Sequence, residues 1–183
     1  MPAAPPVTPP RPHPVIIMVT AVIAAVITAL TPAAVPALGV IVGVLYGVPA
    51  ILWDIRHHIL PDYYTYPLAA AAVASGTVLI LIGQAATGIT MLLTGGATAG
   101  VYLILALVSP MGLGDAKLAA GAAAFVGYYG WLPAAAAFIL TYVAALPQAL
   151  YAVWQKQTMV ALGPAILAAA AGVHLWNTIQ CII

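Results

Sequence analysis

Three acidic residues, Asp54, Asp62 and Asp115, are the positions in this chain most able to do chemistry. They stand in a sequence of 183 residues that is 65% hydrophobic and 4% charged. An ionisable side chain at membrane depth is costly, so it is a functional candidate by default. Asp54 follows one apolar segment and Asp115 begins another. We therefore expect these two carboxyl groups at the same depth, on the same side, on different helices.

Two carboxyl groups placed in this way could hydrolyse a peptide bond. One carboxylate would take a proton from a water molecule while the other, protonated, hydrogen-bonds the scissile carbonyl, and the roles would reverse as the amine leaves. Two close acids in a poorly solvated site can hold a single shared proton. The structural alternative is a helix cap for Asp115 and an interfacial ion pair between Asp54 and Arg56. A small proton-coupled transporter could use the same pair as a relay, although the sequence shows no internal repeat typical of transporters.

The composition excludes a water-soluble protein and predicts the elements that must position the acids. Mean hydropathy is +1.15, and a membrane-spanning helix needs about 20 apolar residues. We predict an all-α, polytopic transmembrane helix bundle of about seven helices, a six-helix core plus one N-terminal helix. The apolar segments are 15–31, 37–53, 67–84, 88–109, 112–131, 132–154 and 162–182.

Two regions differ in composition. Residues 1–14 contain seven prolines, which favour an extended, solvated chain, so we predict a disordered N-terminal tail. Residues 15–183 form the predicted transmembrane domain, with 37–183 as its core. Segment 15–31 could instead be a signal peptide, a reading that leaves the sidedness of everything downstream unchanged.

The four basic residues predict the orientation. Seven crossings place Arg11, Arg56, Lys117 and Lys156 on one side, and the turns of the other side carry none. The positive-inside rule makes that side the cytoplasm. The expected location is the bacterial inner membrane, with the N-terminus and both acids at the cytoplasmic face.

Two motifs resemble those of the type IV prepilin leader peptidases, which are intramembrane aspartic proteases of the G-x-G-D type. M111-G-L-G-D-A-K-L118 is similar to their G-x-G-D-x-K-L motif. D54-I-R-H-H-I-L-P-D-Y-Y-T-Y-P67 resembles their first motif, an Asp followed by a polar turn, L-P-D and T-x-P. A weaker likeness is A161-L-G-P-A-I-L167, where the family often has a G-P pair.

The resemblance implies an aspartic endopeptidase with Asp54 and Asp115 as catalytic residues. Asp62 matches a position where relatives tolerate Asn. Gly112 and Gly114 would give freedom and access beside Asp115. Lys117 and Arg56 would orient the site or anchor the chain to lipid phosphate.

The resemblance also implies the partners. The substrate would be a prepilin or pseudopilin precursor, cut behind its short basic leader at the cytoplasmic membrane face. The zinc-binding C-x-x-C insert of bifunctional relatives is missing, because Cys181 is the only cysteine, so we expect no metal and no other cofactor. Membrane lipid is the other expected partner, nucleic acid is not expected, and the oligomeric state stays open.

Overall fold

The computed structural model describes residues 13–57, 59–108, 112–155 and 161–182. Throughout these ranges every regular element is a helix, which confirms the all-α prediction. The predicted tail, 1–14, lies almost wholly outside the described residues. The elements are α1 Pro14–Leu30, η1 Pro32–Ala34, α2 Val35–Val42, η2 Gly43–Gly47, α3 Val48–His57, α4 Asp62–Leu81, α5 Ala85–Val108, α6 Leu113–Val126, η3 Gly127–Tyr129, α7 Trp131–Trp154 and α8 Gly163–Ile182.

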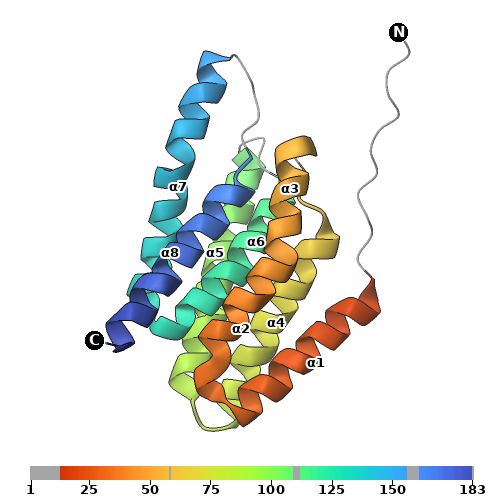
Figure 1. Cartoon of the computed structure of the whole chain (residues 1–183), viewed down its shortest axis with the longest axis vertical. Coiled ribbons are helices and arrows are strands. Elements are labelled where there is room, and N and C mark those ends of the chain that lie inside the picture. Colours follow the sequence, from red (N-terminus) through yellow and green to blue (C-terminus); the bar gives the residue numbers. More distant parts are fainter. Residues whose placement is uncertain (1–12, 58, 109–111, 156–160, 183) are drawn as a thin grey trace.

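These elements form seven continuous helical segments, here called rods, which is the number that hydropathy predicts. The second rod consists of η1, α2, η2 and α3, which follow one another without a break, and η3 continues α6. Four rods are long and apolar enough to cross a membrane: Pro32–His57, Asp62–Leu81, Ala85–Val108 and Trp131–Trp154. α1 is a shorter apolar helix of 17 residues. In Figure 1 the rods lie side by side in one bundle, with α6 enclosed by its neighbours and α7 at one edge beside α8.

α6 forms the centre of the bundle, and its composition explains why. It consists largely of Ala and Gly, so neighbouring helices approach its backbone closely. A β-carbon on Gly121 would lie 3.0 Å from Cγ of Leu68 in α4, and one on Gly95 of α5 would lie 2.9 Å from Cβ of Ala124. α6 contacts α4, α5, α7 and α8. α6, which carries Asp115 in its first turn, is therefore held in place by several other helices.

α1 contributes to the core and is joined to the bundle by polar contacts. Ala24 is fully buried, and the hydroxyl of Thr28 donates a hydrogen bond of 3.0 Å to the Ser75 hydroxyl in α4. Thr20 and Tyr46 share a further hydrogen bond of 2.8 Å between α1 and η2. Hydrogen bonds between helices satisfy polar groups for which a lipid environment offers no partner.

The region between the second and third rods differs from the prediction. We expected a loop at 55–66, but α3 continues to His57 and α4 begins at Asp62. Asp54 therefore lies about one turn before the end of its helix. Asp62 is the first residue of α4 and not part of a turn, a position where the helix dipole favours a carboxylate. Local polarity suggested a loop, but polar residues at the membrane surface are compatible with a helix.

Candidate active site

Asp54 lies on the buried face of α3. Its side chain is 4% exposed, whereas the neighbouring Leu52 and Ile55 are each more than half exposed. The backbone N–H of Gly163, the first residue of α8, donates a hydrogen bond of 3.2 Å to Oδ2 of Asp54. N–H groups in the first turn of a helix have no partner within that helix and attract anions. α8 thus anchors the carboxyl group of Asp54.

Asp115 lies in the first turn of α6 and is 9% exposed. Its backbone N–H donates a hydrogen bond of 3.1 Å to the carbonyl of Gly112, the residue preceding the helix. The carboxyl oxygen Oδ1 is buried and has no hydrogen-bond partner among the described residues. A buried acceptor without a donor costs about 1–3 kcal/mol. This oxygen is therefore suited to bind a water molecule or a peptide group.

Leu60 links the two acids. A β-carbon on Gly114, next to Asp115, would lie 2.5 Å from Cβ of Leu60. A β-carbon on Gly163, whose N–H binds Asp54, would lie 3.6 Å from the Leu60 methyl groups. The carboxyl groups of Asp54 and Asp115 are also close enough to interact electrostatically. Two carboxyl groups 61 positions apart in the sequence thus share one buried site.

The type IV leader peptidase family matches residues 41–153 of the chain. The chain belongs to this family. The match includes both acids, and it agrees with the resemblance carried by the two motifs. No curated protein and no solved structure gave a match. Membership of the family makes the chain a peptidase, and its long apolar helices indicate a membrane protein. Gly163 lies beyond the matched residues, yet it contacts Asp54.

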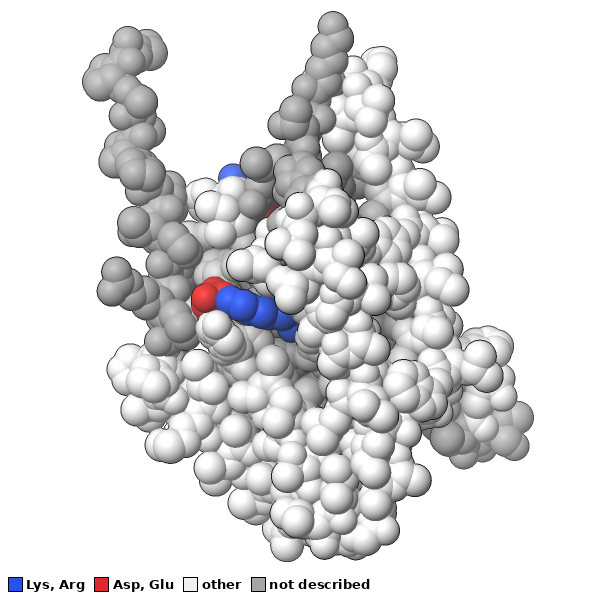
Figure 2. Space-filling model, turned by 180° about the vertical axis from the view of Figure 1, so that it is seen from behind, with Lys and Arg blue, Asp and Glu red and all other residues white. Residues whose placement is uncertain are grey.

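The two basic residues predicted to support the peptidase site, Lys117 and Arg56, have different surroundings. Lys117 donates a hydrogen bond from Nζ to Oδ1 of Asp62 at 2.5 Å, and its Nζ lies 4.5 Å from the ring centre of Tyr66. Figure 2 shows a basic and an acidic side chain in contact on a largely uncharged face. Arg56 is exposed. Lys117 therefore joins α6 to α4. From the sequence we predicted a contact with lipid phosphate for Lys117 and did not predict this link between two helices.

The two glycines before Asp115 differ from each other. Neither has a positive φ, so the backbone freedom expected of them is not used. A β-carbon on Gly112 would meet nothing closer than 3.7 Å, whereas one on Gly114 would lie 2.7 Å from the carbonyl oxygen of Leu60 as well as close to its Cβ. Gly114 is required for close packing. Gly112 is not.

Sequence reasoning missed several neighbours of the peptidase acids. Tyr102 of α5 and Tyr142 of α7 lie within electrostatic range of Asp115 and pack in one aromatic cluster with Phe138. The buried hydroxyl of Tyr142 has no hydrogen-bond partner in the part of the chain that the structure describes. Nothing in the spacing of these tyrosines marks them, because tyrosines in such a chain are ordinarily read as interfacial. Gly163 did carry a signal, the G-P pair of the third motif.

The part of the chain that the structure describes holds no candidate metal centre. The described residues contain no group of three or more His, Cys, Asp or Glu side chains able to hold an ion.

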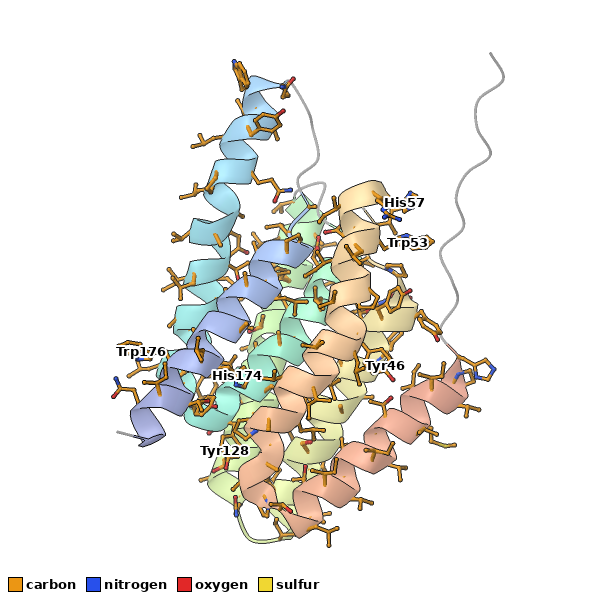
Figure 3. The ribbon with its side chains drawn as sticks, in the orientation of Figure 1. Tyr46, Trp53, His57, Tyr128, His174 and Trp176 are labelled. Atoms are coloured by element: carbon orange, nitrogen blue, oxygen red, sulfur yellow. The ribbon has the colours of Figure 1, made fainter. Side chains whose placement is uncertain are left out.

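Trp53 and His57 lie at one end of the bundle, with ring centres 4.8 Å apart, and Tyr128 lies toward the other end, as Figure 3 shows. Aromatic side chains at both ends are typical of helices that cross a bilayer.

Proposed function

We propose that this peptidase is of the aspartic type and removes the leader of a prepilin or pseudopilin, with Asp54 and Asp115 as its catalytic residues. The observation that carries the proposal is the pairing of two buried carboxyl groups at the ends of different rods. One is held by a backbone N–H, and the other has a buried oxygen with no partner among the described residues. Family membership supports peptide hydrolysis and favours it over a proton-relay transporter.

The reaction needs only these two groups and a water molecule. One carboxylate accepts a proton from the water as its oxygen attacks the scissile carbonyl, and the other acid donates a hydrogen bond to the carbonyl oxygen. The acid then protonates the leaving amine, so the pair exchanges its shared proton between the two steps. Leu60 and the surrounding helices exclude bulk water, which strengthens these polar interactions.

The substrate and the side of cleavage follow from the resemblance. Such a precursor has a short basic leader ahead of a hydrophobic helix, and cleavage would occur at the cytoplasmic face of the bacterial inner membrane. Arg56, exposed at the end of α3, and the ion pair between Lys117 and Asp62 lie at the same end of the bundle as the acids. Basic residues collected at one end agree with a cytoplasmic position.

The test is cleavage in cells that co-express the peptidase and a prepilin, followed by the change in substrate mobility. Asp54→Asn and Asp115→Asn keep shape but cannot exchange the proton, so each should reduce cleavage at least about 100-fold. Asp62→Asn is the matched control, because it removes the third acid, which pairs with Lys117 outside the catalytic pair. It should keep most activity. Equal membrane abundance of the three variants must be verified.

Two outcomes would overturn the assignment. Normal cleavage by both Asp54→Asn and Asp115→Asn would eliminate the aspartic mechanism. Loss of cleavage in Asp62→Asn together with retention in Asp54→Asn would show that the wrong acid of the first motif had been chosen.

A further inference from the structure

A groove of about 340 Å³ lies between the second rod and α8. One wall includes Val44, Val48 and Ile51, the opposite wall Pro164 and Leu167, and Phe125 of α6 forms part of the floor. Val44 and Val48 are about half exposed. The groove therefore opens toward the surroundings of the bundle, where a membrane protein meets lipid or another transmembrane segment.

The groove begins at the candidate active site. Ile51 is three residues before Asp54, and Pro164 follows Gly163, whose N–H binds the Asp54 carboxyl group. Gly39 lines the other end. At 1.5 Å per residue, the stretch from Gly39 to Ile51 extends about 18 Å, more than half of a hydrocarbon core about 30 Å thick. An elongated occupant lying across the bilayer would thus end beside the acids.

Three glycines at intervals of four residues, Gly39, Gly43 and Gly47, follow the second rod. A β-carbon on Gly39 would strike Phe125 and one on Gly47 would strike Leu167, so both glycines are used for packing within the chain. A β-carbon on Gly43 would meet nothing within 4 Å. Such spacing lets two transmembrane helices approach closely. Gly43 also begins the π-helical turn η2, a distortion often found at functional sites.

A second, polar feature marks the far end of the groove. His174 is 6% exposed and lines the groove, and Figure 3 shows it on α8 in the middle of the bundle. Its Nδ1 lies 3.4 Å from the Tyr129 hydroxyl. A buried imidazole that lines an apolar groove can offer a polar contact to whatever fills the groove.

We propose that this groove holds the hydrophobic helix of the substrate, an inference that rests on the proposed function. A polypeptide cut between Asp54 and Asp115 must continue into the bilayer from that point, and the groove is continuous with it. The exposed face of Gly43 fits a helix backbone, and His174 offers the buried helix a polar contact. An acyl chain has no need of either feature.

The first experiment compares two glycine variants. Gly43→Leu fills the middle of the groove, and Gly100→Leu is its matched control, because a β-carbon on Gly100 of α5 also meets nothing within 4 Å and Gly100 does not line the groove. On a full-length prepilin, Gly43→Leu should raise KM about tenfold with little change in kcat, the pattern of lost substrate binding. Gly100→Leu should match the wild type. Equal KM values for the two variants would overturn the proposal.

The second experiment remains informative if Gly43→Leu folds poorly. Cysteines replace Gly43 or Gly100 in a Cys181→Ser, Asp115→Asn background, and the prepilin carries one cysteine in its hydrophobic helix. Oxidation should join enzyme to substrate through position 43 and not through position 100. Enzyme joined only to enzyme would assign the groove to a second copy, and no cross-link at all would assign it to lipid. Both results overturn the proposal.

The two levels of inference fail in different ways. If the wild type cleaves no prepilin, the proposed function fails and the groove proposal fails with it. If the wild type cleaves while the position-43 variants behave like the position-100 controls, only the groove proposal fails.

Discussion

Replacing Gly114 by alanine should damage the peptidase far more than the same change at Gly112. The two glycines are separated by one residue, and both precede Asp115. A β-carbon on Gly114 would lie 2.5 Å from Cβ and 2.7 Å from the carbonyl oxygen of Leu60, whereas one on Gly112 would meet nothing closer than 3.7 Å. The two variants therefore add the same methyl group to a crowded position and to an open one.

The size of the effect follows from the geometry. Ordinary contacts of a β-carbon begin near 3.4 Å, so the start of α6 must move about 0.9 Å from Leu60 Cβ, or Leu60 must move instead. The obstacle includes backbone, which cannot rotate away. Overpacking of this kind costs about 1–3 kcal/mol. A displacement of about 1 Å at a catalytic group can reduce a rate about 100-fold. Asp115 is one residue away, so we expect cleavage to fall about 10- to 100-fold.

The assay measures prepilin cleavage and thermal unfolding of the purified proteins in detergent. Gly114→Ala should be less stable and much slower than the wild type, with kcat affected more than KM. Gly112→Ala should remain within about twofold of the wild type, as open surface positions usually do. Wild-type cleavage by Gly114→Ala, or equal losses in both variants, would refute the packing argument.

Three further predictions concern other contacts. Asp62→Asn and Lys117→Met should each lower the unfolding free energy by at most about 1 kcal/mol, because the ion pair is partly exposed. The double variant Asp62→Lys, Lys117→Asp should restore part of the lost stability. A much larger loss of stability in urea unfolding would contradict this prediction. Gly163→Ala should slow cleavage about tenfold, because the added β-carbon would lie 2.9 Å from Oδ2 of Asp54 and would displace that carboxyl group by about 0.5 Å. An unchanged kcat would refute this prediction. A cysteine at Gln84 should react with impermeant reagents from outside and one at Ile59 only from inside, and the reverse pattern would eliminate the predicted orientation.

Hydropathy alone predicted the rods of this fold, and it did so for a physical reason. A segment in lipid must satisfy its backbone hydrogen bonds internally, so a long apolar segment forms a helix. The predicted segment 88–109 corresponds to α5, Ala85–Val108, and segment 132–154 to α7, Trp131–Trp154. The boundary near Asp62 was wrong because the first turns of α4 are polar. Surface polarity does not distinguish a loop from a helix end.

The candidate site was partly predictable. Asp54 and Asp115 stand out because acids are rare in an apolar chain, and the structure brings them together. The pairing of Lys117 with Asp62 could not be foreseen, because it depends on how α6 and α4 are rotated against each other. The same holds for Tyr102 and Tyr142, which reach the surroundings of Asp115 from α5 and α7. Hydropathy gives the depth of a residue but not the direction of its side chain.

The contacts that fix the two acids are mostly close approaches of backbone, and this follows from the chain's composition. With 4% charged residues there are few ion pairs to orient a site. The pair that the described residues show, Lys117 with Asp62, is partly exposed. Asp54 is instead held by the N–H of Gly163, and Asp115 is placed by the packing of Gly114 on Leu60. One added methyl group at either glycine should therefore slow cleavage more than removal of the whole ion pair.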